Sequence, residues 1–93
     1  MKIYSAQELQ YAMEAIPDWS VVNAVIERTY QFADFKQALG FIVQVGLLAE
    51  QADHHPEIFN VYNKVTIRLN THSANAITSK DVDLAMKMEA LKK

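Results

Sequence analysis

The chain has 93 residues, 51% of them hydrophobic, and a formal net charge of −2. This length predicts a single domain over residues 1–93 that buries about 60% of its unfolded surface. Acids and bases are interspersed, so no electrostatic footprint for nucleic acid or an anionic membrane is present. The absence of cysteine excludes disulfides, thiolate chemistry and cysteine-based zinc sites.

The first ten residues, MKIYSAQELQ, lack the apolar segment of a signal peptide. No apolar run approaches the roughly 20 residues that are needed to span a bilayer. We therefore expect a soluble, cytoplasmic protein that has no membrane partner and makes no direct contact with nucleic acid.

A helix-start signature opens the chain. Ser5 and Glu8 have the spacing of a capping box, and Tyr4 and Leu9 are placed for a hydrophobic staple. Pro17 ends the predicted helix, because the residue before a proline is pushed out of the α region.

Residues 19–32, WSVVNAVIERTYQF, are rich in β-branched and aromatic side chains. Ile26, Tyr30 and Phe32 share one parity, which is typical of a half-exposed strand. Asn23-Ala24 is a candidate turn. The segment therefore predicts two short antiparallel strands.

Asp34 begins the longest predicted helix, with Gln37 at the position that reaches back in a capping box. The helix should end near Ala52. It carries two apolar rows, so it either packs the second row against the terminal helices or presents it to a partner. The first row comprises Phe35, Ala38, Leu39, Ile42, Val45, Gly46 and Ala49, and the second Phe41, Leu48 and Ala52.

Residues 58–69 predict a hairpin, since Val65, Ile67 and Leu69 alternate with polar residues. Asn63-Lys64 can form its turn, because Asn tolerates positive φ. If both residues form the loop, the extrapolated partner of His72 is His55; if the turn centres on Asn63 alone, the partner is His54. Either register brings His72 beside the histidine pair.

A third capping box, Thr78 to Asp81, begins a last helix that runs to about Leu91, with Ile77 and Val82 as its staple. The predicted order is therefore α, ββ, α, ββ, α. This order indicates an α+β fold in which helices pack on a four-stranded antiparallel sheet.

The histidines, His54, His55 and His72, are the candidate chemical groups. Histidine both donates and accepts protons near neutral pH, and neighbouring histidines cannot all be cationic, so a cluster holds an acid beside a base. Three histidines and a water could instead bind zinc, as in a zinc hydrolase, although adjacent histidines on an extended segment point in opposite directions. A helix-end or surface role is the third alternative.

Two acids and two aromatic residues have structural as well as functional interpretations. Asp81 completes a capping box, which explains it without chemistry. Glu50 near a helix C-terminus is mildly unfavourable, which hints at another use such as orienting a histidine. Trp19 and Tyr62 are typical of a core, while stacking on a flat heterocycle is their functional alternative.

Together these residues follow the spacing E-x3-H-H-P-x5-Y-x9-H-x8-D, from Glu50 to Asp81. This spacing resembles the signature of the pterin-4a-carbinolamine dehydratases, also known as dimerisation cofactors of a homeodomain transcription factor. The similarity extends to Pro17-Asp18-Trp19, to residues 27–35 and to the long helix, and covers about Trp19 to Ala85.

The resemblance implies a two-layer fold with the helices on one face of the sheet. It implies a hydro-lyase that converts 4a-hydroxytetrahydrobiopterin to quinonoid dihydropterin and water, with no metal or organic cofactor. This reaction recycles the cofactor of aromatic amino-acid hydroxylases. His54, His55 and His72 would be the acid–base set, supported by Asp81 and Glu50.

The resemblance also implies which residues bind the substrate and which assemble the protein. It implies a homodimer or homotetramer through the helix at 35–52, which favours Phe41 and Leu48 as the interface row. An oligomerising interaction module of the coactivator type is the alternative function. The implied substrate-binding residues are Asp53, His54, His55, Asn70, Thr71, His72 and Ser73, with Trp19 bordering the ring.

One segment departs from the family, which often carries glycines after the third histidine. Here the run is Ser73-Ala74-Asn75-Ala76-Ile77. Asn75 can adopt positive φ, whereas Ala76 cannot do so cheaply, so we expect the loop to follow a path of its own.

Overall fold

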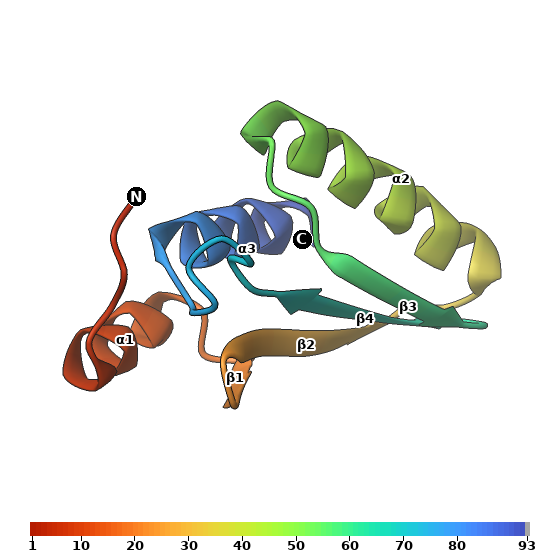
Figure 1. Ribbon diagram of the computed structural model, residues 1–93. Coiled ribbons are helices and arrows are strands. Elements are labelled where there is room, and N and C mark those ends of the chain that lie inside the picture. The colour runs from red at the N-terminus through yellow and green to blue at the C-terminus, as the bar shows by residue number, and fades with distance from the viewer. Residues whose placement is uncertain (93) are drawn as a thin grey trace.

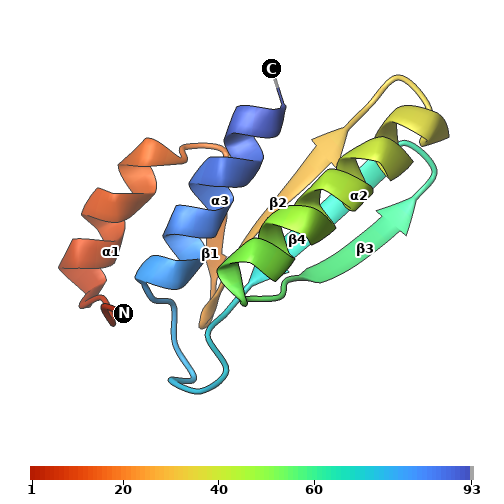
Figure 2. The same ribbon diagram turned by 90° about the horizontal axis from the view of Figure 1, so that it is seen from above.

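The computed structural model describes residues 1–92 as helices and a four-stranded antiparallel sheet arranged in two layers (Figure 1). The predicted α+β class and element order are confirmed, and α2 and α3 cover one face of the sheet (Figure 2). None of the described helices is long and apolar enough to cross a membrane. The elements are α1 (Ala6–Ala12), continued by a 3-10 turn (Met13–Ala15), β1 (Ser20–Val22), β2 (Val25–Gln31), α2 (Phe35–Ala52), β3 (Glu57–Val61), β4 (Lys64–Leu69) and α3 (Ser79–Leu91).

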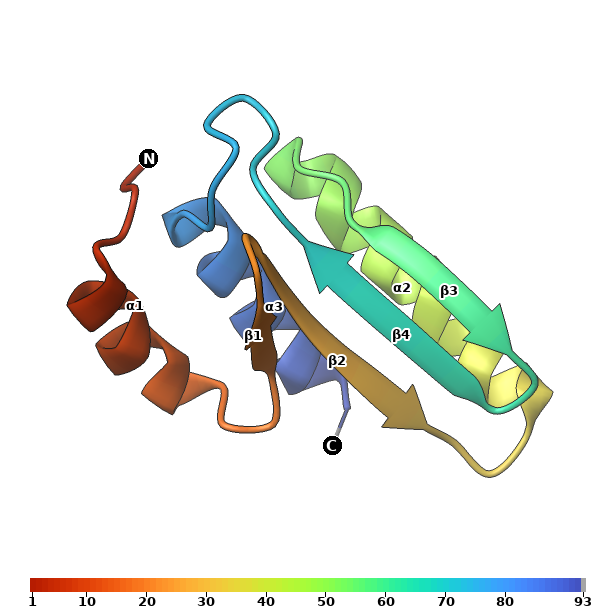
Figure 3. The same cartoon turned by 60° about the horizontal axis from the view of Figure 1, so that its bottom comes forward.

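The sheet has the strand order β1-β2-β4-β3, so the two hairpins meet at its centre (Figure 3). Ile26 lies opposite Leu69, and Tyr30 lies opposite Val65. These side chains and Ile67 are buried with α2 and α3, as their alternation predicts. Glu27 and Thr29 on β2 and Thr66 and Arg68 on β4 face the opposite side, which none of the described helices covers (Figure 1).

The β3–β4 turn differs from the prediction. Val61 pairs with Lys64, so the loop consists of Tyr62 and Asn63 rather than Asn63 and Lys64, and Tyr62 takes the positive φ of 51°. A neighbouring segment decides this register: the Asn63 amide donates to the Phe32 carbonyl at 2.9 Å, and the Phe32 N–H donates to the Asn63 carbonyl at 2.8 Å. Extrapolated, the register places His72 opposite Asp53, so strand pairing alone does not bring the histidines together.

Helix α2 is apolar on two faces, as predicted, but the assignment of the second row to an interface was wrong. Phe41 is only 5% exposed, and its ring packs on those of Tyr30 and Phe32, with centroids 4.6 and 5.1 Å away. The covered face combines Phe41 of the second row with Ala38, Val45 and Ala49 of the first, because the helix docks on Tyr30 of β2 and on Phe32 just after it. The exposed apolar row consists of Phe35, Leu39, Val43 and Leu47.

The helix starts follow the capping predictions closely. Full capping boxes form at Ser5–Glu8 and Thr78–Asp81. At α2 the Asp34 side chain accepts from the Gln37 N–H, but the Gln37 side chain reaches the Ala33 N–H instead of closing the box. Capping depends on groups within one helical turn, which explains why sequence located these ends well.

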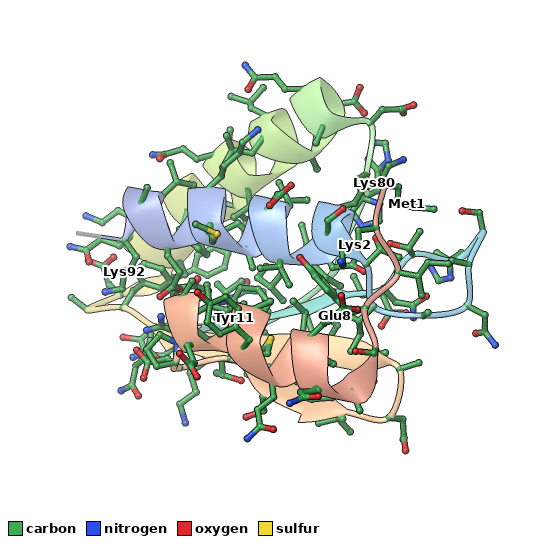
Figure 4. The ribbon with its side chains drawn as sticks, turned by 90° about the vertical axis from the view of Figure 1, so that its left-hand side faces the viewer. Met1, Lys2, Glu8, Tyr11, Lys80 and Lys92 are labelled. Atoms are coloured by element: carbon green, nitrogen blue, oxygen red, sulfur yellow. The ribbon has the colours of Figure 1, made fainter. Side chains whose placement is uncertain are left out.

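The N-terminal segment ties α1 to the start of α3 (Figure 4). The Lys2 N–H donates to Ser79 Oγ at 2.9 Å, and the Ser79 N–H donates to the Lys2 carbonyl at 2.8 Å. The Lys2 ammonium lies 2.7 Å from Glu8 Oε2, and with the Ser5 contacts it lowers the pKa of Glu8 to about 2. The first turn of α1 is therefore held to the C-terminal helix through a charged contact.

A polar cluster lies at the interface of the sheet with α3. The Glu89 carboxylate accepts hydrogen bonds from the Trp19 indole N–H at 3.2 Å, from the Tyr30 hydroxyl, and from Arg28 Nη1 at 2.5 and 2.6 Å. Burial, followed by the bond to Glu89, raises the pKa of Tyr30, so this hydroxyl remains a donor. Trp19 is therefore a core residue whose polar atom is satisfied.

We expect Glu89→Ala to lower the free energy of unfolding by about 2–3 kcal/mol, because three partly buried donors lose their shared acceptor. Urea denaturation measures this loss. Asp83→Ala, an exposed acid on the same helix, is the matched control and should change stability by less than about 0.5 kcal/mol. Equal effects of the two substitutions would contradict the assigned role of the cluster.

Candidate active site

Three connections converge at one end of the sheet: the segment after α2, the β1–β2 turn and the loop between β4 and α3 (Figure 3). The first carries His54 and His55, and the last carries His72. They meet because β4 pairs with β2 on one side and with β3 on the other. This end of the sheet is therefore the candidate active site.

The turn after α2 points the two adjacent histidines in opposite directions. Asp53 adopts the left-handed conformation at φ 49° and ψ 44°, and the His54 N–H donates to the Ala49 carbonyl at 3.1 Å. The chain then continues toward β3 in extended form, where successive side chains alternate. As a result the His54 side chain is 10% exposed, whereas that of His55 is 58% exposed.

His54 is held by a carboxylate that is fully buried. Its Nε2 lies 2.5 Å from Oδ1 of Asp81, which is 0% exposed. The other oxygen, Oδ2, accepts from the Thr71 hydroxyl at 2.9 Å and from the Thr78 N–H at 2.8 Å. Asp81 thus completes the capping box and contacts a histidine at the same time, so its two sequence-based interpretations are compatible.

His55 and His72 are the accessible histidines. His55 Nε2 lies 2.8 Å from Oε1 of Glu50, which projects from the last turn of α2. This pair is exposed, so it orients the imidazole more than it stabilises the fold. Of the described residues, none hydrogen-bonds the imidazole of His72.

The loop that carries His72 needs only one left-handed residue. Thr71 and Ala76 pair through their backbone groups, with the Thr71 N–H donating to the Ala76 carbonyl at 3.0 Å. Asn75 takes the positive φ of 48°, as its side chain permits, and Ala76 does not. The loop therefore closes without the glycines expected from the resemblance.

His55 and His72 line a common cavity of about 300 Å³, which is a size suited to a small molecule. Of the other predicted site residues only Asn70 lines this cavity, and its amide donates to the Ala24 carbonyl. Residues missed by the sequence analysis complete the lining: Asn23, Ala24, Val25, Glu57, Arg68, Leu69 and Asn75.

The remaining predicted residues lie elsewhere around the site. Asp53 forms the turn after α2, and Thr71 is buried against Asp81. Ser73 lies in the exposed loop, outside the lining of the cavity. Trp19 is held in the core by Glu89, so in this structure it does not border the cavity.

Two of the missed residues, Asn23 and Ala24, form the β1–β2 turn, and the others lie on β2, β3, β4 and the loop after β4. The sequence had identified Asn23-Ala24 as a candidate turn but could not place it next to β4. Strand order, rather than any local signal, brings this turn to the site. Within residues 1–92, no three His, Asp or Glu side chains gather in an arrangement that could hold a metal ion.

Comparisons with known proteins cover nearly the whole chain. The model of the family "Pterin 4 alpha carbinolamine dehydratase" matches residues 2–91. A Solibacter usitatus protein bearing the name of a pterin-4-alpha-carbinolamine dehydratase is 51% identical over 94% of this chain and 92% of its own length. A similarly named Burkholderia multivorans protein is 40% identical over 94% of this chain and 87% of its own length. The crystal structure of a "transcriptional coactivator/pterin dehydratase" from Brucella melitensis matches with a TM-score of 0.94, at 41% identity over 98% of this chain and 99% of that one.

The His54–Asp81 contact generates a spectroscopic prediction. A carboxylate only accepts, so His54 Nε2 carries a proton in the wild-type protein. In Asp81→Asn the side-chain oxygen still serves Thr71 and Thr78 while the amide donates to Nε2, so the proton should move to Nδ1. Imidazole ¹⁵N chemical shifts report this change of tautomer.

The matched control is Asp83→Asn, which should leave the tautomer of His54 unchanged. We expect Asp81→Asn to fold with a loss of about 1–3 kcal/mol, because a neutral acceptor replaces a charged one. A protonated Nε2 in folded Asp81→Asn protein would contradict the assigned contact.

Proposed function

Because the chain belongs to the pterin 4 alpha carbinolamine dehydratase family, we propose that its cavity binds a 4a-hydroxytetrahydropterin and removes water from it. The proposed substrate is 4a-hydroxytetrahydrobiopterin, and the proposed product is quinonoid dihydrobiopterin. The observation that carries the proposal is the pair of imidazoles, His55 and His72, on the wall of a cavity of about 300 Å³.

The reaction requires two proton transfers. The C4a–O bond breaks and the hydroxyl leaves as water after it gains a proton. N5 loses its proton, and the electron pair of that N–H bond forms the C4a=N5 double bond. One protonated and one neutral imidazole therefore suffice, and no electrons are exchanged with another molecule.

The contacts of each imidazole limit which nitrogen can act. His55 Nε2 is occupied by Glu50 at 2.8 Å, so Nδ1 is the nitrogen left for the substrate. Both nitrogens of His72 are available. After one turnover a proton has passed from one imidazole to the other, and both side chains are exposed to solvent through which the starting state is restored.

We assign His54 and Asp81 a positioning role in this scheme. His54 is nearly buried, and it lies next to His55 in the chain. Its bond to Asp81 fixes the backbone from which His55 projects. The expected acid–base set of three histidines is thereby narrowed, in this proposal, to His55 and His72, with Glu50 orienting His55.

The cavity also offers groups that suit the pyrimidinone edge of a pterin. Asn70 uses its amide nitrogen on the Ala24 carbonyl, which leaves its amide oxygen to accept from a ligand. Asn23 and Asn75 line the same cavity and bring both donors and acceptors. We propose that the enzyme regenerates the tetrahydropterin of aromatic amino-acid hydroxylases in the cytoplasm, without a metal or organic cofactor.

Stopped-flow dehydration of synthetic 4a-hydroxytetrahydrobiopterin tests this function. We expect His55→Ala and His72→Ala each to lower the catalysed rate by roughly 10²–10⁴-fold, the usual contribution of a proton-transfer group. Gln51→Ala, an exposed substitution on the last turn of α2, is the matched control and should retain the wild-type rate.

Two outcomes would count against the proposal. Wild-type protein that accelerates the reaction no more than buffer does would exclude the dehydratase. Full activity in both histidine variants, once folding is verified by circular dichroism, would move the acid–base pair to other residues.

A second role, as an oligomerising interaction module, is favoured by the exposed apolar row of α2. Phe35, Leu39, Val43 and Leu47 follow i, i+4 spacing and are each 45–62% exposed. Such a stripe on a small domain is typical of a helix–helix interface. We propose that copies of this chain associate through this row into a homodimer or homotetramer, a role that can coexist with catalysis.

Sedimentation velocity tests the association. We expect the wild-type protein to sediment as an oligomer, and Leu39→Glu/Leu47→Glu to sediment as a monomer, because two charges would be buried without partners. Lys36→Glu/Gln44→Glu, on exposed positions of the same helix, is the control for added charge. Monomeric wild-type protein at tens of micromolar would contradict the proposed interface.

A further inference from the structure

A charged row crosses the sheet on its uncovered side, at the end that holds the histidines. Arg68 on β4 lies between Glu27 on β2 and Glu57 on β3, each directly opposite it in the register. Its Nε is 3.6 Å from Glu27 Oε1 and 3.9 Å from Glu57 Oε1. Both distances are too long for hydrogen bonds, so within residues 1–92 the guanidinium has no hydrogen-bond acceptor.

A purely structural role would account for part of this arrangement. Opposite charges on neighbouring strands stabilise a sheet by about 0.2–1 kcal/mol per pair. An exposed row of this kind is at the low end of that range, since Arg68 is 44% and Glu57 70% exposed. The structural role does not account for the place of Arg68 and Glu57 in the wall of the histidine cavity.

Arg68 and Glu57 also line a second hollow, of about 360 Å³, that extends over the uncovered face of the sheet. This hollow includes Glu27, Phe59 and Thr66. The charged row is therefore the boundary between the cavity of the histidines and adjoining space on the sheet. A ligand that extends from the first cavity into the second passes Arg68 and Glu57, the residues that line both.

The structure of the proposed substrate indicates which of its groups would contact the charged row. The reacting carbon C4a is bonded to N5, and N5 is bonded to C6, the carbon that bears the substituent of a pterin. If C4a and N5 meet His55 and His72, the C6 substituent begins within the same cavity. We infer that the charged row is the subsite for this substituent and that it selects a short, neutral, hydroxylated chain; the inference rests on the proposed dehydratase function.

The charges of the row decide the class of substituent. One arginine and two glutamates sum to a formal charge of −1, so an anionic tail would be repelled by the carboxylates that flank the guanidinium. An apolar chain would remove the unpaired N–H donors of Arg68 from water without replacing their hydrogen bonds. A hydroxyl on the substituent could accept a hydrogen bond from the Arg68 guanidinium and donate one to the Glu57 carboxylate. Two adjacent hydroxyls could divide these two bonds between them.

The experiment compares two substrates in two proteins. Dehydration of 4a-hydroxytetrahydropterins carrying a 6-dihydroxypropyl or a 6-methyl group is followed in wild-type protein and in Arg68→Met. We expect wild-type kcat/KM to be about 10-fold higher for the diol, as for one or two hydrogen bonds at a part-exposed site. Arg68→Met should lose this preference by lowering kcat/KM for the diol alone.

Two further variants make the comparison specific. Glu57→Gln keeps the shape of the second partner but removes its charge, and should weaken the diol preference less than Arg68→Met does. Lys64→Met removes a cation from the same strand at its opposite end and should leave both substrates unaffected. Thermal unfolding verifies that each variant is folded. Because the charged row contributes little stability, we expect melting temperatures close to that of the wild-type protein.

The outcomes separate the subsite from the function it serves. Catalysis of neither substrate by wild-type protein would overturn the dehydratase and the subsite together. Catalysis of both substrates with equal kcat/KM, or an equal loss on both in Arg68→Met, would overturn the subsite and leave the dehydratase intact. A pterin with an anionic 6-substituent that outcompetes the diol, and loses its advantage in Arg68→Met, would overturn the choice of a neutral chain.

Discussion

The buried carboxylate of Asp81 is the constraint on which the site depends. A carboxylate without exposure to water costs several kcal/mol unless its oxygens are paired. Its partners come from three separate parts of the chain: Thr71 after β4, Thr78 at the start of α3, and His54 after α2. Satisfying this one group therefore brings together the segments that hold the histidines, and the same bonds that stabilise the fold position the proposed chemistry.

That constraint leaves one histidine nearly buried and two accessible. With His54 turned inward to Asp81, the alternation of an extended chain turns His55 outward to the cavity. The loop after β4 contributes His72 to the same cavity, and the β1–β2 turn contributes Asn23 and Ala24. By contrast, the polar groups of Trp19, Arg28 and Tyr30 are all bonded to Glu89, at the interface of the sheet with α3.

The sequence predictions succeeded where the deciding contacts are local. The caps at Ser5, Asp34 and Thr78 depend on residues within one helical turn, and all formed. The predictions failed where a distant segment decides. The hairpin loop moved by one residue because Asn63 bonds to Phe32, which belongs to another part of the chain. The covered face of α2 combines Phe41 with Ala38, Val45 and Ala49 of the other predicted row, because Phe41 packs on Tyr30 of β2 and on Phe32 just after it.

By itself the sequence determined the α+β class, the helix starts, the alternation of β4 and a spacing of Glu50, histidines and Asp81 that led to the family. These features depend on periodicity and on hydrogen bonds between residues that are close in the chain, and both can be recognised in the sequence. Only the tertiary structure decided that His54 is nearly buried, that Trp19 belongs to the core, and that Arg68 and Asn23 share a cavity with His55 and His72. Those outcomes depend on strand order and helix docking, in which residues far apart in sequence compete for the same partners.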